Sequence, residues 1–589
     1  MAYDLEPLAA PRAAGALLRT FVTLVESGAT RALLANKLLR DAGIVALRSA
    51  PTHEPLEACH PGFGRALPEP AGGDEQAAAP APAEPPTGRK SARGATPDAE
   101  AIAARLPEPP GDGFRPETVL DFLAAYRERK LSPVEVAERA LDFVAQSEQH
   151  DPAMRIFIAQ DRDDVLAQAE ASAKRWKKRR PRGPLDGVPV AIKDELDQKG
   201  YGTTVGTRFL GVEPATADAE AVARLRAAGA LLLGKTNMHE IGLGVTGLNP
   251  HHGSARNPYD PARATGGSSS GPAAAVAAGL CPLALGADGG GSIRIPAALC
   301  GVVGLKPTFG RVSEVGAAEL CWSVAHVGPI GATVRDVALG YALIAGPDPK
   351  DANSLHQPAP DFRGLDRHEL SGLRLGVYGP WFEHAEPSIV ERCKRVLHAL
   401  EHAGAQIREI EIPELRLLRT VHLVTIISEI ATAHLEHYRH HRTEYGLDTR
   451  LSLALARGLQ AYDYVHAQRH RARLCRHFER VLADVDAIVT PATGCTAPVL
   501  PLDALHSGES NLALIDQIMR FAPAPNLTGL PAISVPAGYD DAGLPVGLQI
   551  IGRAWHEHVL LRIAAVAEQH VTRQPPAVGY RYLESAEKT

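Results

Sequence analysis

The chain has 589 residues, of which 45% are hydrophobic and 22% are charged, so it can bury a substantial core. Its formal net charge of −6 gives no reason to expect nucleic acid as a main partner. The seven cysteines are scattered and odd in number, which argues against a disulfide framework and favours a reducing compartment. With no secretory layout at the N-terminus and no run of about 18 apolar residues, we expect a cytoplasmic protein without a membrane span.

The chain begins with a helical pattern that gives way to a polar, proline-rich stretch. Apolar residues recur at helical spacing: Leu17, Leu18, Phe21, Leu24 and Val25. Such helices pack on a main domain, rest on a membrane surface or cover a hydrophobic cleft, and the first case is the commonest. Alanine, proline, glycine and acids then replace the large apolar residues, as is typical of a linker. We therefore expect an N-terminal helical segment (1–60), an Ala/Pro-rich linker (61–113) and a main domain (114–589).

The main domain mixes helix and strand signals along its length. Ser132-Pro133-Val134-Glu135 is a capping box with proline at the first helical position. A further helix is expected over Ala219–Ala228. Short apolar runs predict buried strands: Val188–Ile192, Ala230–Leu233, Ala487–Thr490, Ile533–Val535 and Leu544–Ile551. This mixture predicts an α/β protein with helices around a central sheet.

One of these strands ends on a lysine, Lys193. Burying an ammonium group is costly, so a lysine at this position is unusual. It is either a functional amine or a lysine that snorkels to solvent or pairs with a neighbouring acid such as Asp194. Position alone leaves both interpretations open.

Three weaker patterns each allow an ordinary structural interpretation and a functional one. Gly242 to Gly247 matches the dinucleotide pattern GxGxxG, but it follows a helix-like segment instead of a strand. The basic run Lys174–Arg180 is commonly a solvated helix end. The histidines His434, His437, His440 and His441 fit one helix face, which is more often a polar surface than a zinc site. We expect no cofactor and no metal.

The stretch Gly266–Arg294 has a Gly/Ser-rich turn at each end and small apolar residues between them. The first turn runs into a plausible buried helix start at Ala273–Ala278. Glycines ahead of a helix let the backbone turn sharply and direct free N–H groups at one point. Such a group of donors stabilises negative charge. A serine in each turn, Ser268 and Ser292, favours acyl transfer over phosphate binding.

The sequence segments around these serines and the lysine resemble those of a known family. The strand ending in Lys193-Asp194, the segment GKTNMHE (234–240), GGSSSG (266–271) and GADGGGSIRIPAALCGVVGLKPT (286–308) resemble the amidase signature family. This resemblance implies the amidase signature fold, a central mixed β-sheet surrounded by helices, with an N-terminal helical extension in this chain.

Other segments are similar to the plant-type fatty acid amide hydrolase branch of that family. They are the N-terminal block ALLRTFVTLVESGATRALLANKLL (16–39), TPATGCTAP (490–498) and GLPAISVPAGYDDAGLPVGLQIIGR (529–553). The branch implies hydrolysis of N-acylethanolamines or other long-chain acyl amides. Aryl acylamidase or general amidase activity is the first alternative, and a tRNA-dependent amidotransferase subunit or a non-catalytic scaffold are more distant ones.

The resemblance also implies a role for each site residue. Ser292 is the nucleophile, Ser268 the bridging acid/base and Lys193 the terminal base. A cis peptide bond is implied between Gly267 and Ser268. The oxyanion hole is formed by the backbone N–H groups of Gly289, Gly290, Gly291 and Ser292. A lysine acts as a base only when uncharged, and burial disfavours its charged form.

Two further expectations concern the acyl chain and partners. Met519 and Phe521 lie in an apolar stretch that lines either an acyl pocket or the ordinary core. The N-terminal helices are expected to border the opening for the acyl chain and to contact a membrane surface or a partner subunit. We therefore expect a homodimer with peripheral membrane contact and no nucleic-acid partner.

Overall fold

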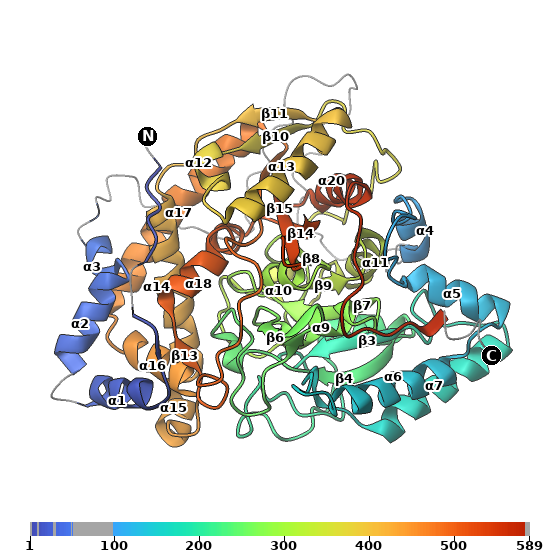
Figure 1. Ribbon diagram of the computed structural model, residues 1–589, viewed down its shortest axis with the longest axis horizontal. Coiled ribbons are helices and arrows are strands. Elements are labelled where there is room, and N and C mark those ends of the chain that lie inside the picture. Colours follow the sequence, from blue (N-terminus) through green and yellow to red (C-terminus); the bar gives the residue numbers. More distant parts are fainter. Residues whose placement is uncertain (1–2, 9–10, 28–30, 49, 51–97, 584–589) are drawn as a thin grey trace, which may run out of the picture.

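The computed structural model describes residues 3–8, 11–27, 31–48, 50 and 98–583. Its centre is an eleven-stranded mixed sheet with helices around it, which confirms the α/β class (Figure 1). The strands in spatial order are β11 (Gln406–Glu409), β10 (Arg374–Val377), β12 (Ala487–Pro491), β15 (Pro545–Gly552), β14 (Ala532–Tyr539), β8 (Val303–Lys306), β9 (Val327–Gly331), β7 (Leu283–Ala287), β3 (Pro189–Lys193), β4 (Leu231–Thr236) and β2 (Phe157–Ala159). Two small ribbons pair β1 (Ala13–Ala14) with β13 (Glu509–Ser510) and β5 (Arg256–Asn257) with β6 (Asp260–Ala264).

All five strands expected from short apolar runs are present, as β3, β4, β12, β14 and β15. Most neighbouring strands are antiparallel, but β3 pairs in parallel with both β7 and β4. Every residue of these three strands is buried. Because parallel strands end at the same edge, the carboxyl ends of β7, β3 and β4 meet there, and that edge carries the site.

Helices cover the sheet on both faces, and a separate helical layer lies beside it (Figure 1). The expected capping box is confirmed, because Ser132 and Glu135 each bond the other's backbone N–H at the start of α6. The helices around the sheet are α5 (Val119–Glu128), α6 (Pro133–Ser147), α7 (Arg162–Lys177), α8 (Glu220–Ala227), α9 (Ser270–Ala277), α10 (Arg294–Leu299), α11 (Val334–Ile344), α12 (Gly379–Phe382), α13 (Pro387–His402) and α20 (Glu557–Gln569). The helical layer consists of α14 (Leu415–Ala433), α15 (Leu435–His441), α16 (Leu447–Ala456) and α17 (Ala461–Asp484). After α18 (Leu512–Met519), the short helix α19 (Pro523–Thr528) packs on α14 and α17.

The N-terminal helices α1 (Gly15–Glu26), α2 (Arg31–Asp41) and α3 (Ile44–Leu47) pack on this helical layer (Figure 1). On α1, Leu18, Val22 and Val25 are buried in one cluster with residues of α15 and α16. Glu26 accepts hydrogen bonds from Tyr438 Oη at 2.7 Å and Arg450 Nε at 2.7 Å. The expected packing of these helices on the main domain is confirmed, and they share its core.

The main domain begins earlier than expected. Asp98 caps α4 (Ala99–Ala104), whose buried face, with Leu106 just beyond it, packs on α11. The end of the expected linker, 61–113, is therefore wrong, because its last part is folded against the sheet domain. Residues 61–97 of that linker lie outside the described residues.

Residues of the weaker sequence patterns make ordinary structural contacts. Trp176, in the basic run, donates its indole N–H to Asp186 O at 2.8 Å, while Lys174 is exposed at the helix end. His434 contacts Tyr445 Oη at 3.1 Å, whereas His441 pairs with Glu444 at 2.7 Å. Within the described ranges, no three His, Cys, Asp or Glu side chains are grouped so that they could hold a metal ion. None of the helices in those ranges is long and apolar enough to cross a membrane.

Candidate active site

Strand β3 carries Lys193 to the edge where the parallel strands end. The side chain is fully buried (0% exposed). Its Nζ lies 2.8 Å from Ser268 Oγ, 3.1 Å from Ala287 O and 2.6 Å from Glu195 Oε2. The lysine therefore does not snorkel; it contacts one of the two predicted catalytic serines directly.

The acidic neighbour of the lysine is Glu195, whereas the ion-paired interpretation names Asp194. Asp194 Oδ2 accepts the N–H of Gly206 at 3.0 Å, and its Oδ1 lies 3.4 Å from Lys235 Nζ. The chain turns after β3, with the N–H of Leu196 bonded to the carbonyl of Lys193 at 3.1 Å. This turn directs the side chains of Asp194 and Glu195 to different partners.

The first Gly/Ser-rich turn gives each serine its own role. Ser269 Oγ donates to Ala287 O at 3.2 Å, and Ser270 Oγ donates to Asn237 O at 3.3 Å. These two bonds tie the start of α9 to the ends of β7 and β4. Ser268, between the glycines and this anchor, is 2% exposed. The turn thus fixes the hydroxyl of Ser268 against the lysine.

The peptide bond between Gly267 and Ser268 is cis, as the family resemblance implies. A side chain at Gly267 would collide with Gly247 N at 2.9 Å and Gly244 O at 3.1 Å. The segment that matches the dinucleotide pattern therefore packs beneath the serine turn. Its glycines permit this close approach of two backbones.

Asp288 organises the second turn, between β7 and α10. Its carboxylate accepts the N–H groups of Gly291 at 2.6 Å and Ile293 at 3.1 Å, and it pairs with Arg294 at 3.0 Å. Arg294 is fully buried and also donates to Asn526 Oδ1 at 2.5 Å. Burial alone would raise the pKa of Asp288, but the charge and hydrogen bonds of Arg294 outweigh it and hold that pKa below its usual range. An ionised carboxylate therefore fixes the shape of the turn.

Ser292 lies within this turn and is the most accessible of the three predicted catalytic residues, at 7% exposed. Its backbone carbonyl accepts the N–H of Ser269 at 3.1 Å, which joins the two turns. Within residues 98–583, its hydroxyl has no hydrogen-bond partner. The backbone bond between Ser269 and Ser292 therefore places the two serine turns next to each other.

Three of the four expected oxyanion donors remain available. The N–H of Gly291 is bonded to Asp288. The N–H groups of Gly289, Gly290 and Ser292 meet no protein acceptor in the described part of the chain. Converging backbone N–H groups stabilise a developing oxyanion.

Helix α14 closes over this turn through His422. His422 Nε2 donates to Gly289 O at 2.9 Å, because a carbonyl oxygen can only accept. Burial lowers the pKa of His422 to about 4, so the imidazole is neutral near pH 7. This contact joins residues far apart in the chain, and no local pattern in the sequence could have indicated it.

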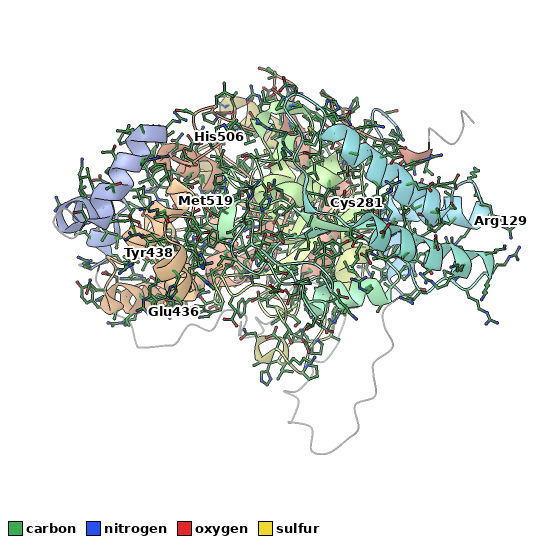
Figure 2. All side chains as sticks on the ribbon, turned by 90° about the horizontal axis from the view of Figure 1, so that it is seen from below. Arg129, Cys281, Glu436, Tyr438, His506 and Met519 are labelled. Atoms are coloured by element: carbon green, nitrogen blue, oxygen red, sulfur yellow. The ribbon has the colours of Figure 1, made fainter. Side chains whose placement is uncertain are left out.

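Met519 and Phe521 have different surroundings. A Cβ at Gly290 would lie 3.1 Å from Met519 Cε, so Met519 borders the turn that holds Gly290. Phe521 is fully buried, and its ring centroid lies 5.6 Å from that of Trp381. Figure 2 places Met519 toward the N-terminal helices, with Arg129 at the opposite end. The contacts of Met519 suit an acyl pocket, which stays a prediction, while those of Phe521 favour core packing.

A cavity of about 420 Å³ lies elsewhere, lined by residues of β10, β11 and the end of α17, including Arg374, Arg408 and Arg480. Strands β10 and β11 form the opposite end of the sheet from β3. This cavity is therefore remote from Lys193, and its charged lining does not suit an acyl chain.

The mixed sheet, the two serine turns and the buried lysine define an amidase-type hydrolase. Residues 138–561 match the family described as Amidase, and the chain belongs to the amidase signature family. It is 39% identical over 602 aligned positions to a fatty acid amide hydrolase from Arabidopsis thaliana, covering 99% of this chain and 97% of the relative.

Other relatives share most of the chain. A glutamyl-tRNA(Gln) amidotransferase subunit from Symbiobacterium thermophilum is 39% identical, over 76% of this chain and 95% of the relative. The solved structure of a peptide amidase from Stenotrophomonas maltophilia is similar with a TM-score of 0.68 and 30% identity, over 78% of this chain and 98% of that one.

Proposed function

We propose that this protein is a serine amide hydrolase that cleaves N-acylethanolamines or other long-chain fatty acid amides to fatty acid and amine. The proposed triad is Ser292, Ser268 and Lys193. The observation that carries the chemistry is the 2.8 Å contact between Lys193 Nζ and Ser268 Oγ in a buried site. The turn that holds Ser292 is bonded to the turn that holds Ser268.

In the proposed reaction, the hydroxyl of Ser292 attacks the amide carbonyl carbon and passes its proton to Ser268 Oγ. The proton of Ser268 moves to the neutral amine of Lys193. The N–H groups of Gly289, Gly290 and Ser292 stabilise the oxyanion. The relay then runs in reverse and protonates the amine as the C–N bond breaks. Water attacks the acyl-enzyme through the same relay, which releases the fatty acid and restores Ser292.

The substrate class is supported by the extent of the match with the plant relative. The Arabidopsis alignment includes 99% of this chain and so extends over the N-terminal helices, whereas the amidotransferase alignment includes 76%. On α1, Leu17 and Leu24 are exposed apolar side chains. We therefore propose that these helices border the acyl opening and contact a membrane surface or a partner copy, in a cytoplasmic homodimer.

The test compares acyl amides of different chain length, using the full chain. Acetyl and decanoyl p-nitroanilides and N-decanoylethanolamine are assayed with the wild type, Ser292→Ala and Ser452→Ala, a control serine on α16. We expect Ser292→Ala to lower turnover by about 10³-fold or more, whereas Ser452→Ala stays close to the wild type. The wild type should prefer the decanoyl substrates, because an apolar pocket gains free energy from each buried methylene.

The nucleophile, the substrate class and the catalytic activity can each be disproved separately. Near-normal turnover by Ser292→Ala would end the nucleophile assignment. A preference for the acetyl substrate would favour the alternative, an aryl acylamidase or general amidase. A fluorophosphonate probe that fails to label the wild type would favour a non-catalytic scaffold.

A further inference from the structure

Lys193 and Glu195 form a buried pair inside the proposed site. Glu195 is 6% exposed, and its Oε2 lies 2.6 Å from Lys193 Nζ. The other two neighbours of the amine are Ser268 Oγ and Ala287 O. The amine therefore has three oxygen partners, and only one of them, the serine hydroxyl, can donate a proton.

These three oxygen partners determine how a neutral lysine amine is oriented. A neutral amine has two N–H donors and one lone pair. A backbone carbonyl and a carboxylate only accept, so they take the two N–H groups. The lone pair is then left facing the hydroxyl of Ser268, as a base that receives its proton requires.

We infer that Glu195 is a positioning residue for the base Lys193: it orients the amine toward Ser268 and places a negative charge in contact with it. This inference rests on the proposed function. A carboxylate in contact with the amine in a buried site stabilises the ammonium form. Removing the charge of Glu195 should therefore favour the neutral amine that the proposed relay needs.

Other ionisable groups near this end of the site are less suited to that role. Burial, followed by the charges of Glu195 and Glu429, raises the pKa of the Cys321 thiol well above its usual range, so it stays uncharged. Burial, followed by neighbouring carboxylates, raises the pKa of Glu314 well above its usual range and favours its neutral form. Glu429, on α14, accepts from Ser323 N at 3.1 Å.

The other carboxylates close to the lysine in the described chain each have a cation of their own: Asp288, which follows Ala287, pairs with Arg294 at 3.0 Å. Asp194 and Lys235 lie 3.4 Å apart on the neighbouring turn and strand. Glu195 is therefore the carboxylate in direct contact with the Lys193 amine.

The test is the pH profile of kcat/KM for decanoyl p-nitroanilide, from about pH 5 to about pH 10. Glu195→Gln keeps an acceptor oxygen and removes the charge. We expect its acid limb to move to lower pH by about one unit or more, because a charge in contact shifts a titration by that amount. Glu195→Asp keeps the charge on a shorter side chain. We expect the acid limb of its pH profile to stay in place while the plateau of kcat/KM falls about tenfold or more. Glu314→Gln is the matched control and should leave the limb unmoved.

A uniform loss of kcat/KM at every pH in Glu195→Gln, with the limb unmoved, would mean a structural role only and would overturn the inference. Fluorophosphonate labelling at high pH checks that the site of each variant is intact. If Glu195→Gln does not fold, Glu195→Asp decides, because a plateau equal to the wild type would exclude the orienting role. Ser292→Ala and Lys193→Ala are assayed in the same series. Turnover that survives Ser292→Ala would overturn the proposed function itself, whatever the behaviour of Glu195→Gln.

Discussion

At the scale of single residues, the site depends on where side chains are absent as much as on where they are present. A Cβ at Gly290 would lie 2.8 Å from His422 Cε1, and one at Gly289 would lie 2.7 Å from Cys321 Sγ. The oxyanion turn is therefore pressed against α14 and the segment after β8. This close packing restricts the turn, and a fixed backbone is the condition for stabilising charge in a transition state.

Gly290→Ala tests this packing. The added methyl group must displace His422 or Met519, or shift the turn, and a misplacement of about 1 Å costs about 100-fold in rate. We therefore expect kcat/KM to fall by about 100-fold while the thermal unfolding midpoint changes little. Gly111→Ala is the control, because a Cβ at Gly111 has no atom within 4 Å. Full activity in Gly290→Ala would show that the turn is not the oxyanion site.

At the scale of elements, α1 illustrates how adjacent residues differ. Leu18 is fully buried against the helical layer, whereas Leu17 is 64% exposed. The helix is amphipathic, and its buried face continues the core of the main domain. Its exposed face is the part available for a membrane or another copy.

The two leucines give a matched pair of variants. Leu18→Ala leaves a cavity in the shared core, and we expect it to lower the free energy of unfolding by about 2–4 kcal/mol. Leu17→Ala removes only exposed surface and should change it by less than about 0.5 kcal/mol. Urea-unfolding midpoints of the two variants, compared at equal slope, measure the difference. Equal effects would contradict the docking of α1 on the helical layer.

The elements predicted most accurately from the sequence are those with strong local signals. Strands such as β3 and β14 are short apolar runs buried on both faces, and α6 carries a complete capping box. Helix α4 is not predicted because its sequence is poor in large apolar residues. It is stabilised by packing on α11, which is distant in the sequence.

The chemistry of the site is predicted unevenly for a related reason. The segments that resemble the family indicate the two serines and the lysine as site residues. The identity of the lysine's acidic neighbour depends on side-chain directions in the turn after β3, where strand alternation no longer applies. Glu195 and His422 act through tertiary contacts, which leave no periodic signal in a single sequence.

At the scale of the whole molecule, the site lies between two layers. The sheet supplies Lys193 and both serine turns, and the helical layer supplies His422, with the N-terminal helices packed outside that layer (Figure 1). Closure of the site therefore depends on the stability of the helical layer. Three buried histidines of that layer, His422, His434 and His470, make this stability depend on pH.

Burial lowers the pKa of each of these histidines to about 4. The ordinary histidine value is about 6.5, so between about pH 4 and about pH 6.5 the unfolded chain binds more protons. The stability contributed by each neutral histidine is thus complete above about pH 6.5 and is lost as the pH falls toward about 4, by about 1.4 kcal/mol per pH unit. Asp336 acts in the opposite direction, because burial raises its pKa to about 7.

A variant comparison isolates one histidine from these opposing groups. The wild type, His434→Gln and His398→Gln all retain Asp336, so its effect cancels between them. We expect the change in unfolding free energy between pH 7 and pH 5 to be smaller in His434→Gln by about 2 kcal/mol, because the variant has no proton to bind at that position. His398, whose side chain is 73% exposed, is the control, and its variant should follow the wild type. If acid lowers the stability of His434→Gln as much as that of the wild type, protonation of His434 does not destabilise the helical layer.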